Sequence, residues 1–414
     1  MKLLSTIAGL GLLAGAAGAG ANWPQFRGPD GQGQADAAKL PLTWSAGQNV
    51  AWRTELPGTG WSSPVIWGDR IWMTTATETG RSLRVLCVDK AKGKLLHDVE
   101  VFHREKPLEI QNKNSHASPT PVLEEGRVYV SFGTMGTACL AADTAAVLWR
   151  SEELQLDHMT GPGSSPVLYQ NLLVLACDGT NVQYVAALDK DTGKLAWKTP
   201  RSGELKMAPD MRKAFCTPLA VEVDGRDQLV IPGAYWVYGY EPLTGKELWR
   251  VHYGGFSNTP RPVVGHGMVY VGTGFMKPEL WAIRLGGQGD VSATHVAWKA
   301  AEKMPHKPSP VLVGNEIYTV SDTSTATCLD ARTGETVWKE RLTGNFSASP
   351  IVAGGRLYCC SEEGRTTVLA VGRAFKPLAT NEVNERIMAS PAVSGNALFL
   401  RTDKALWRIE EPGR

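Results

Sequence analysis

Basic side chains recur just ahead of a repeated Ser/Thr-Pro step, where they could attract an anionic ligand. These residues are His116, His158, Lys213, Arg261, His306 and Lys307. Carboxylates, sulfates and phosphates are drawn to such groups, and a histidine gains charge as the pH falls through about 6.5. If the steps converge in the fold, the six residues form a ligand-binding rim at the mouth of a channel. The alternative, which the sequence leaves open, is that each is a solvated loop residue.

The residues directly before the prolines of these steps form a second set of side chains that could line a binding site. Seven of the eight are hydroxyl residues, namely Ser63, Thr120, Ser165, Thr217, Ser309, Ser349 and Ser390. Such hydroxyls could line a site, or they could satisfy backbone groups near the start of a strand. Arg261 takes the eighth position with a fixed charge. It is expected either to contact a ligand or to pair with a carboxylate or with carbonyl groups.

Two adjacent cysteines, Cys359 and Cys360, could in principle form a vicinal disulfide. They end the apolar stretch 357–360, which is typical of a strand, and neighbouring strand residues point to opposite faces. The total of seven cysteines is odd and gives no framework of bridges. We expect the pair to be reduced and packed in the fold, with a functional bridge as the alternative. Three further cysteines share one repeat position, as small buried residues do: Cys87, Cys139 and Cys328.

Composition and motifs exclude several function classes. The 414 residues carry a net charge of +2, which does not mark a nucleic-acid binder. Metal-protease, nucleophile-elbow, phosphate-loop and Cys-x-x-Cys patterns are missing. After the first residues, no apolar run is long enough to span a membrane.

The Ser/Thr-Pro step opens a repeat that would position these residues. Each proline begins a short apolar strand, a tight turn and a second strand, and successive prolines are 40–57 residues apart, the length of a four-stranded blade. The eight prolines are Pro64, Pro121, Pro166, Pro218, Pro262, Pro310, Pro350 and Pro391. In a β-propeller the first strand of every blade lines the axis, so the residues before these prolines would converge.

A second phrase, an acidic residue followed by a Thr-Gly turn and a tryptophan, completes the blade. Asp189 leads through Gly193 to Trp197, and Asp330 leads to Trp338. The glycine suits a tight hairpin that needs a positive φ, and the tryptophan is large enough to bridge neighbouring blades. The repeat therefore predicts an all-β, eight-bladed propeller of four-stranded antiparallel blades.

The two ends of the chain predict how the ring closes. The last repeat stops after the strand near Ile409, and the missing fourth-strand phrase stands at 49–53. An N-terminal strand would therefore complete the last blade. We divide the chain into a signal peptide over 1–21, an N-terminal loop segment over 22–39 and one propeller domain over 40–414. The signal peptide has a basic residue, an apolar run and a small-residue cleavage pattern.

The phrase Ala187–Trp197, Ala-Leu-Asp-x-x-Thr-Gly-Lys-x-x-Trp, and the Ser-Pro strand starts resemble the pyrroloquinoline-quinone-type propeller repeat with its tryptophan-docking motif. The opening residues 22–29, Asn-Trp-Pro-Gln-Phe-Arg-Gly-Pro, resemble exported planctomycete-type propellers of unassigned function. Characterised relatives of this blade are the quinoprotein dehydrogenases and the outer-membrane assembly lipoprotein propeller. In the dehydrogenases the resemblance implies a quinone held between a tryptophan and a vicinal disulfide, beside Ca²⁺. No position-by-position match for the Ca²⁺ ligands is found here.

Two function hypotheses follow. The first is an exported, non-catalytic binding or scaffolding propeller of the cell envelope, periplasmic or secreted and monomeric, with no bound cofactor. Its partner would be an envelope protein, an acidic peptide or an acidic glycan, bound at the channel mouth. Loops 102–115, 202–213 and 275–278 would extend that surface. The alternative is a quinone-dependent dehydrogenase with PQQ and Ca²⁺, or another carbohydrate-active enzyme, using the axial funnel.

Overall fold

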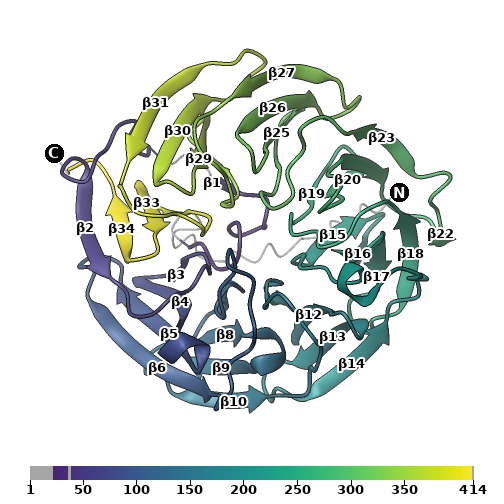
Figure 1. Cartoon of the computed structure of the whole chain (residues 1–414), viewed down its shortest axis with the longest axis horizontal. Helices are drawn as coiled ribbons and strands as arrows, with labels where there is room; N and C mark the ends of the chain where they lie inside the picture. The colour runs from purple at the N-terminus through teal and green to yellow at the C-terminus, as the bar shows by residue number, and fades with distance from the viewer. Residues whose placement is uncertain (1–21, 36–38, 413–414) are drawn as a thin grey trace, which may run out of the picture.

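Eight antiparallel sheets are arranged as blades around a central axis (Figure 1). The computed structural model describes residues 22–35 and 39–412, so the predicted signal peptide over 1–21 lies outside the described residues. Regular secondary structure in these described residues is almost entirely strand, with three short 3₁₀ turns. The predicted all-β, eight-bladed propeller is confirmed. No helix in the described part of the chain has the length and apolar character needed to cross a membrane.

Each blade runs from an inner strand at the axis to an outer strand at the rim. Blades one to four are β3 (Val65–Trp67), β4 (Arg70–Thr77), β5 (Ser82–Asp89), β6 (Leu95–His103); β7 (Val122–Glu124), β8 (Arg127–Ser131), β9 (Thr137–Ala141), β10 (Val147–Ser151); β11 (Val167–Tyr169), β12 (Leu172–Asp178), β13 (Gln183–Asp189), β14 (Leu195–Pro200); and β15 (Leu219–Val223), β16 (Arg226–Pro232), β17 (Trp236–Tyr240), β18 (Glu247–His252).

Blades five to seven are β19 (Val263–Gly265), β20 (Met268–Gly272), β21 (Leu280–Arg284), β23 (Val296–Ala300); β24 (Val311–Val313), β25 (Glu316–Val320), β26 (Thr325–Asp330), β27 (Thr336–Arg341); and β28 (Ile351–Ala353), β29 (Arg356–Cys360), β30 (Arg365–Ala370), β31 (Pro377–Glu382). The 3₁₀ turns are η1 (Glu78–Gly80), η2 (Gly133–Met135) and η3 (Pro209–Met211). A short strand, β22 (Gly289–Asp290), adds to the outer edge of blade four.

Blade eight joins the two ends of the chain. It consists of β32 (Ala392–Ser394), β33 (Ala397–Arg401), β34 (Ala405–Ile409) and the N-terminal strand β2 (Val50–Glu55). Strand β2 pairs antiparallel with β34, with Val50 opposite Ile409 and Glu55 opposite Ala405. The predicted closure is therefore confirmed, and the ring has no open seam between its first and last blades.

The core lies between the blades. Second and third strands are buried on both faces, as in β25 and β26, whereas outer strands alternate between covered and exposed residues, as in β2. A sheet that packs on a neighbour through each face must carry apolar residues at successive positions. Cys87, Cys139 and Cys328 are fully buried in these contacts, as their shared repeat position predicts.

The N-terminal residues 22–35, which we call the N-terminal plug, cross the axial channel. Trp23 forms a β-bridge with Ile66 of blade one, and β1 (Gln34–Ala35) pairs in parallel with β28 of blade seven. The guanidinium of Arg27 donates to the carbonyls of Pro310 and Pro350 at 2.6 and 3.3 Å. The sequence predicts only a loop here. The structure instead packs the segment into the ring, because Arg27 satisfies carbonyls that face the axis.

Candidate functional site

A funnel of about 580 Å³ opens along the axis on one face of the ring. The hydroxyl residues ahead of the inner strands line its floor together with Phe26 of the N-terminal plug: Ser63, Thr120, Ser165, Thr217, Ser349 and Ser390. The three predicted loop insertions all reach this funnel, through Lys113, Asp210 and Phe275 among others. Residues distant in sequence converge here, as the repeat predicts.

The hydroxyl residues tie each blade to the next through hydrogen bonds from backbone to side chain. In one arc the backbone N–H groups of Ser63, Thr120 and Ser165 donate to the hydroxyls of Thr120, Ser165 and Thr217, at 2.9–3.1 Å. In the other arc Arg261, Ser309 and Ser349 donate to Ser309, Ser349 and Ser390, at 2.8–3.0 Å. The hydroxyls therefore accept hydrogen bonds from backbone groups, which is the second of the two alternatives given above. These bonds join neighbouring blades and are not local to one strand.

Arg261 lies beneath the funnel and not at its mouth. Its side chain is buried, and the guanidinium donates to Phe26 O at 2.6 Å, Gln25 Oε1 at 3.0 Å and Pro218 O at 3.2 Å. Burial lowers the pKa of Arg261 to about 10, and Asp30 opposes this shift. Of the two alternatives for Arg261, these contacts match the pairing with carbonyl groups, which the N-terminal plug and Pro218 supply.

Two of the predicted histidines are also held by the chain itself. The imidazole Nε2–H of His116 donates to Leu108 O at 2.7 Å. The ring of His158 is buried and its Nε2 accepts the N–H of Thr134 at 3.0 Å. Burial lowers the pKa of His158 to about 4, against the opposing charge of Asp157. Neither histidine lines the funnel, so the structure does not bring them to the predicted rim.

Lys213, His306 and Lys307 do line the funnel. Lys213 is buried, and burial lowers the pKa of its ammonium although Asp210 opposes the shift. Its Nζ lies 5.7 Å from the ring centre of Phe256. His306 packs edge-on against Phe275 at 5.5 Å. Three of the six predicted rim residues therefore share one wall region, and their binding role stays a prediction.

Aromatic and apolar side chains make up much of the remaining wall. They are Trp61, Phe215, Phe256, Phe275 and Met388. Phe275 is 46% exposed, which is high for a phenylalanine, and contacts Phe256 edge-on at 5.8 Å. A wall of this kind can stack against a flat or apolar group of a ligand.

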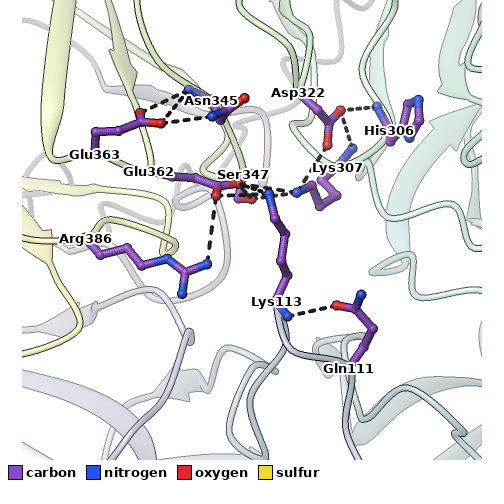
Figure 2. Close-up of polar contacts among 10 residues, drawn as sticks. All are labelled: Gln111, Lys113, His306, Lys307, Asp322, Asn345, Ser347, Glu362, Glu363 and Arg386. Atoms are coloured by element: carbon purple, nitrogen blue, oxygen red, sulfur yellow. Dashed lines mark hydrogen bonds and ion pairs between the residues drawn. The ribbon is translucent and has the colours of Figure 1, made fainter.

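Carboxylates beside the lysines are residues that the sequence reasoning missed. Lys307 pairs with Asp322 at 3.3 Å and with Glu362 at 3.5 Å, and Lys113 reaches Glu362 at 3.1 Å (Figure 2). The signal was in the repeat, because four blades place an acid twelve residues after the proline. These acids are Asp178, Asp322, Glu362 and Asp403. The mouth is therefore less basic than the six cations alone predict.

The quinone cofactor that the dehydrogenase resemblance implies does not fit the residues present. Cys359 and Cys360 are buried free thiols in β29, and they belong to two different core clusters on opposite faces of the sheet. Neither lines the funnel. Among the described residues no group of three or more His, Cys, Asp and Glu is placed to hold a metal ion. The cysteine geometry agrees with strand packing and supplies no clamp for a quinone.

Comparison with known proteins places this ring among related propellers. A curated relative is the tetrathionate hydrolase of Acidithiobacillus ferrooxidans, 23% identical over 317 residues, which are 70% of this chain and 57% of that protein. The chain thus spans little more than half of that relative's length.

Two solved structures show the same fold. BamB from Moraxella catarrhalis is 13% identical with a TM-score of 0.63, covering 88% of this chain and 98% of that one. The quinohemoprotein alcohol dehydrogenase from Comamonas testosteroni is 10% identical with a TM-score of 0.70, covering 96% and 82%. At these identities the likeness concerns the fold alone.

The family described as outer membrane protein assembly factor BamB matches residues 43–204, 135–288 and 233–374. These overlapping matches follow the repeat through most of the ring. The chain therefore belongs to this family of PQQ-like repeat propellers.

Proposed function

We propose that the protein is an exported binding propeller of the cell envelope that takes an acidic ligand into the axial funnel. The observation that carries this proposal is the convergence of Lys113, Lys213 and Lys307 on a funnel whose floor is a ring of hydroxyls. The proposed role is non-catalytic binding or scaffolding, and the protein acts as a monomer.

The floor offers hydrogen-bond donors to a ligand. Thr120, Ser165, Thr217 and Ser390 each accept a backbone N–H, which leaves the hydroxyl proton to be donated. Among the described residues none accepts that proton. A ligand group with oxygen acceptors, such as a carboxylate or a sulfate, complements such a floor.

The walls favour an acidic glycan over an acidic peptide. Trp61, Phe215 and Phe275 offer aromatic surface against which a sugar ring can lie, while the lysines meet its acidic groups. The volume of about 580 Å³ lies in the range of small-molecule sites, which suits a short oligosaccharide segment. Binding of an acidic peptide or of a partner protein would be the alternative outcome of the test.

A binding titration tests the proposal. Trigalacturonate is titrated into the purified protein at low and at moderate salt, with neutral maltotriose, a glutamate-rich peptide and tetrathionate as comparison ligands. We expect trigalacturonate to bind, maltotriose to bind at least tenfold more weakly, and affinity to fall with salt because part of the site is exposed. Tight binding of the peptide alone would redirect the proposal to a protein partner.

Lys307→Met is the matching variant, and Lys339→Met is its control. Lys339 also holds an ion pair, with Glu302, but it lies in the outer strand β27 away from the funnel. We expect Lys307→Met to weaken trigalacturonate binding about tenfold and Lys339→Met to leave it unchanged. Equal affinity of both variants, or no binding by any protein, overturns the proposal.

A further inference from the structure

We propose that Lys113, Lys307 and Arg386 form the binding position for a carboxylate of the ligand, and that Glu362 holds this position until the ligand replaces it. This inference rests on the proposed function and names the place beside the funnel wall, at the lining residues Lys113 and Lys307, where the acidic group binds. Glu362 would then act as a built-in competitor that sets the affinity.

The contacts of Glu362 are those that a bound carboxylate would make. Its oxygens lie 3.1 Å from Lys113 Nζ, 3.5 Å from Lys307 Nζ and 3.9 Å from Arg386 Nη2. The Ser347 hydroxyl donates to it at 2.6 Å. Figure 2 shows the carboxylate between these groups, with Lys113 reaching it from a separate loop.

The electrostatics of Glu362 agree with a strong anion position. Burial alone would raise the pKa of Glu362, but the Ser347 hydroxyl, Lys307 and Lys113 outweigh burial and hold the pKa below its ordinary value. The carboxylate therefore stays charged near neutral pH. Any other carboxylate brought to the same place would be stabilised by the same groups.

Exposure makes the position reachable from the solvent. The side chain of Glu362 is only 10% exposed, whereas those of Lys113, Lys307 and Arg386 are 50%, 31% and 37% exposed. An incoming anion meets the cations before it meets Glu362. In the ion pairs of the described residues, these three cations share two carboxylates, because Asp322 is the second carboxylate on Lys307.

Lys113 comes from a segment that is anchored elsewhere, so its ion pair can be exchanged. Residues 104–117, which we call the crossing segment, join blades one and two. Gln111 N–H and Asn114 Nδ2 donate to Thr160 O at 3.2 and 2.8 Å. From there Lys113 extends to blade seven. A ligand carboxylate that takes the place of Glu362 would pair with Lys113 without displacing these anchors.

The neighbouring Glu363 provides a matched control. Its carboxylate accepts the backbone N–H of Asn345 at 3.0 Å and its side-chain amide at 3.0 Å, and it forms no ion pair with any cation among the described residues. Glu362 and Glu363 thus differ in their cations but share the same turn after β29. Removing either charge changes the net charge of the protein equally.

The experiment compares trigalacturonate affinity for wild type, Glu362→Gln and Glu363→Gln by calorimetry at fixed ionic strength. We expect Glu362→Gln to bind at least tenfold more tightly, because the lysines no longer have an internal partner, and Glu363→Gln to stay within twofold of wild type. In the Glu362→Gln background, Lys113→Met should remove most of the gain.

The outcomes separate this inference from the function on which it rests. If wild type binds trigalacturonate but Glu362→Gln binds no more tightly, Glu362 is a structural ion-pair partner and the inference is overturned while the proposed function stands. If Glu363→Gln gains as much as Glu362→Gln, the effect is long-range charge and the inference is overturned as well. If no variant binds any acidic ligand, both are overturned.

Discussion

The indole ring of Trp197 in blade three lies against Gly245 in the turn of blade four, and its N–H donates to Pro242 O at 3.2 Å. A Cβ on Gly245 would come within 2.3 Å of that ring, and the glycine has a φ of +69°. The same docking recurs between neighbouring blades, in the pairs Trp52–Gly93, Trp149–Gly193 and Trp298–Gly334. The two halves of the second repeat phrase therefore belong to one interface, with the tryptophan and the glycine supplied by successive blades.

Gly245→Ala should lower the free energy of unfolding by about 2–4 kcal/mol, because it combines a strained φ with overpacking of Trp197. Gly267→Ala is the control. Gly267 has a φ of +70° and nothing within 4 Å of an added Cβ, so it should lose only about 1 kcal/mol. Urea titration measures both. Equal losses would mean that the tryptophan does not depend on the glycine.

Arg27→Met should destabilise the protein by about 2–4 kcal/mol. It leaves the carbonyls of Pro310 and Pro350 without a donor from the plug. Methionine carries no charge, so the variant avoids the cost of burying the guanidinium, and this offsets part of the loss. That cost is visible in the pKa of Arg27, which burial and the nearby Arg261 lower to about 9. The exposed Arg284→Met serves as a control and should change stability by less than 0.5 kcal/mol. Identical melting of both variants would show that the plug does not stabilise the ring.

All seven cysteines should titrate as thiols in the denatured, unreduced protein, and few should react while it is folded, because all seven are buried. A thiol reagent with and without denaturant gives both counts. Cys360→Ser should lower the denatured count by one. A count of five in the wild type, rising to six in Cys360→Ser, would instead reveal a bridge between Cys359 and Cys360.

Stability should fall in alkali because burial raises the pKa of Cys87, Cys139 and Cys328 to about 12. The unfolded thiols ionise near pH 8.5, so the contribution of each is complete below that pH and is lost as the pH rises towards 12. Replacing the three with alanine should flatten the dependence by about 1 kcal/mol per pH unit for each residue between pH 9 and 10. Urea titrations at several pH values measure how the free energy of unfolding changes with pH. A loss of packing in the alanine variant lowers this free energy at every pH and does not alter the slope. If the free energy of unfolding fell equally steeply with pH in the variant and the wild type, the raised pKa values of these three cysteines would be contradicted.

The architecture could be predicted because the repeat carries it. Eight prolines in register and one strand phrase missing at Ile409 but present at Val50 are enough to deduce the ring and its closure. The residues before the prolines converge for the same reason. These are consequences of strand order, and strand order leaves a periodic trace in the sequence.

The chemistry of the site could be predicted only in part. Whether Arg261 faces solvent depends on the N-terminal plug, which belongs to no repeat. The pKa of His158 is lowered by burial, and periodicity does not describe that burial. Lys113 meets Glu362 only through the path of the crossing segment, an irregular loop. The acids after the second strands, by contrast, did have a repeat position and could have been found.

The N-terminal plug and the closing strand also govern how the chain can fold. The carbonyl groups that accept hydrogen bonds from Arg27 lie 283 and 323 residues further along the chain, and Val50 pairs with Ile409 across the closing sheet. Contacts between residues so far apart in the sequence form late and make folding slow. During synthesis Arg27 and strand β2 therefore lack these partners until the last blades have been made, and blade edges stay open to wrong pairing until then. A nascent chain of this kind gains most from a chaperone that holds it unfolded until synthesis ends. Loss of the C-terminal strand β34 would leave the N-terminal strand β2 without its partner.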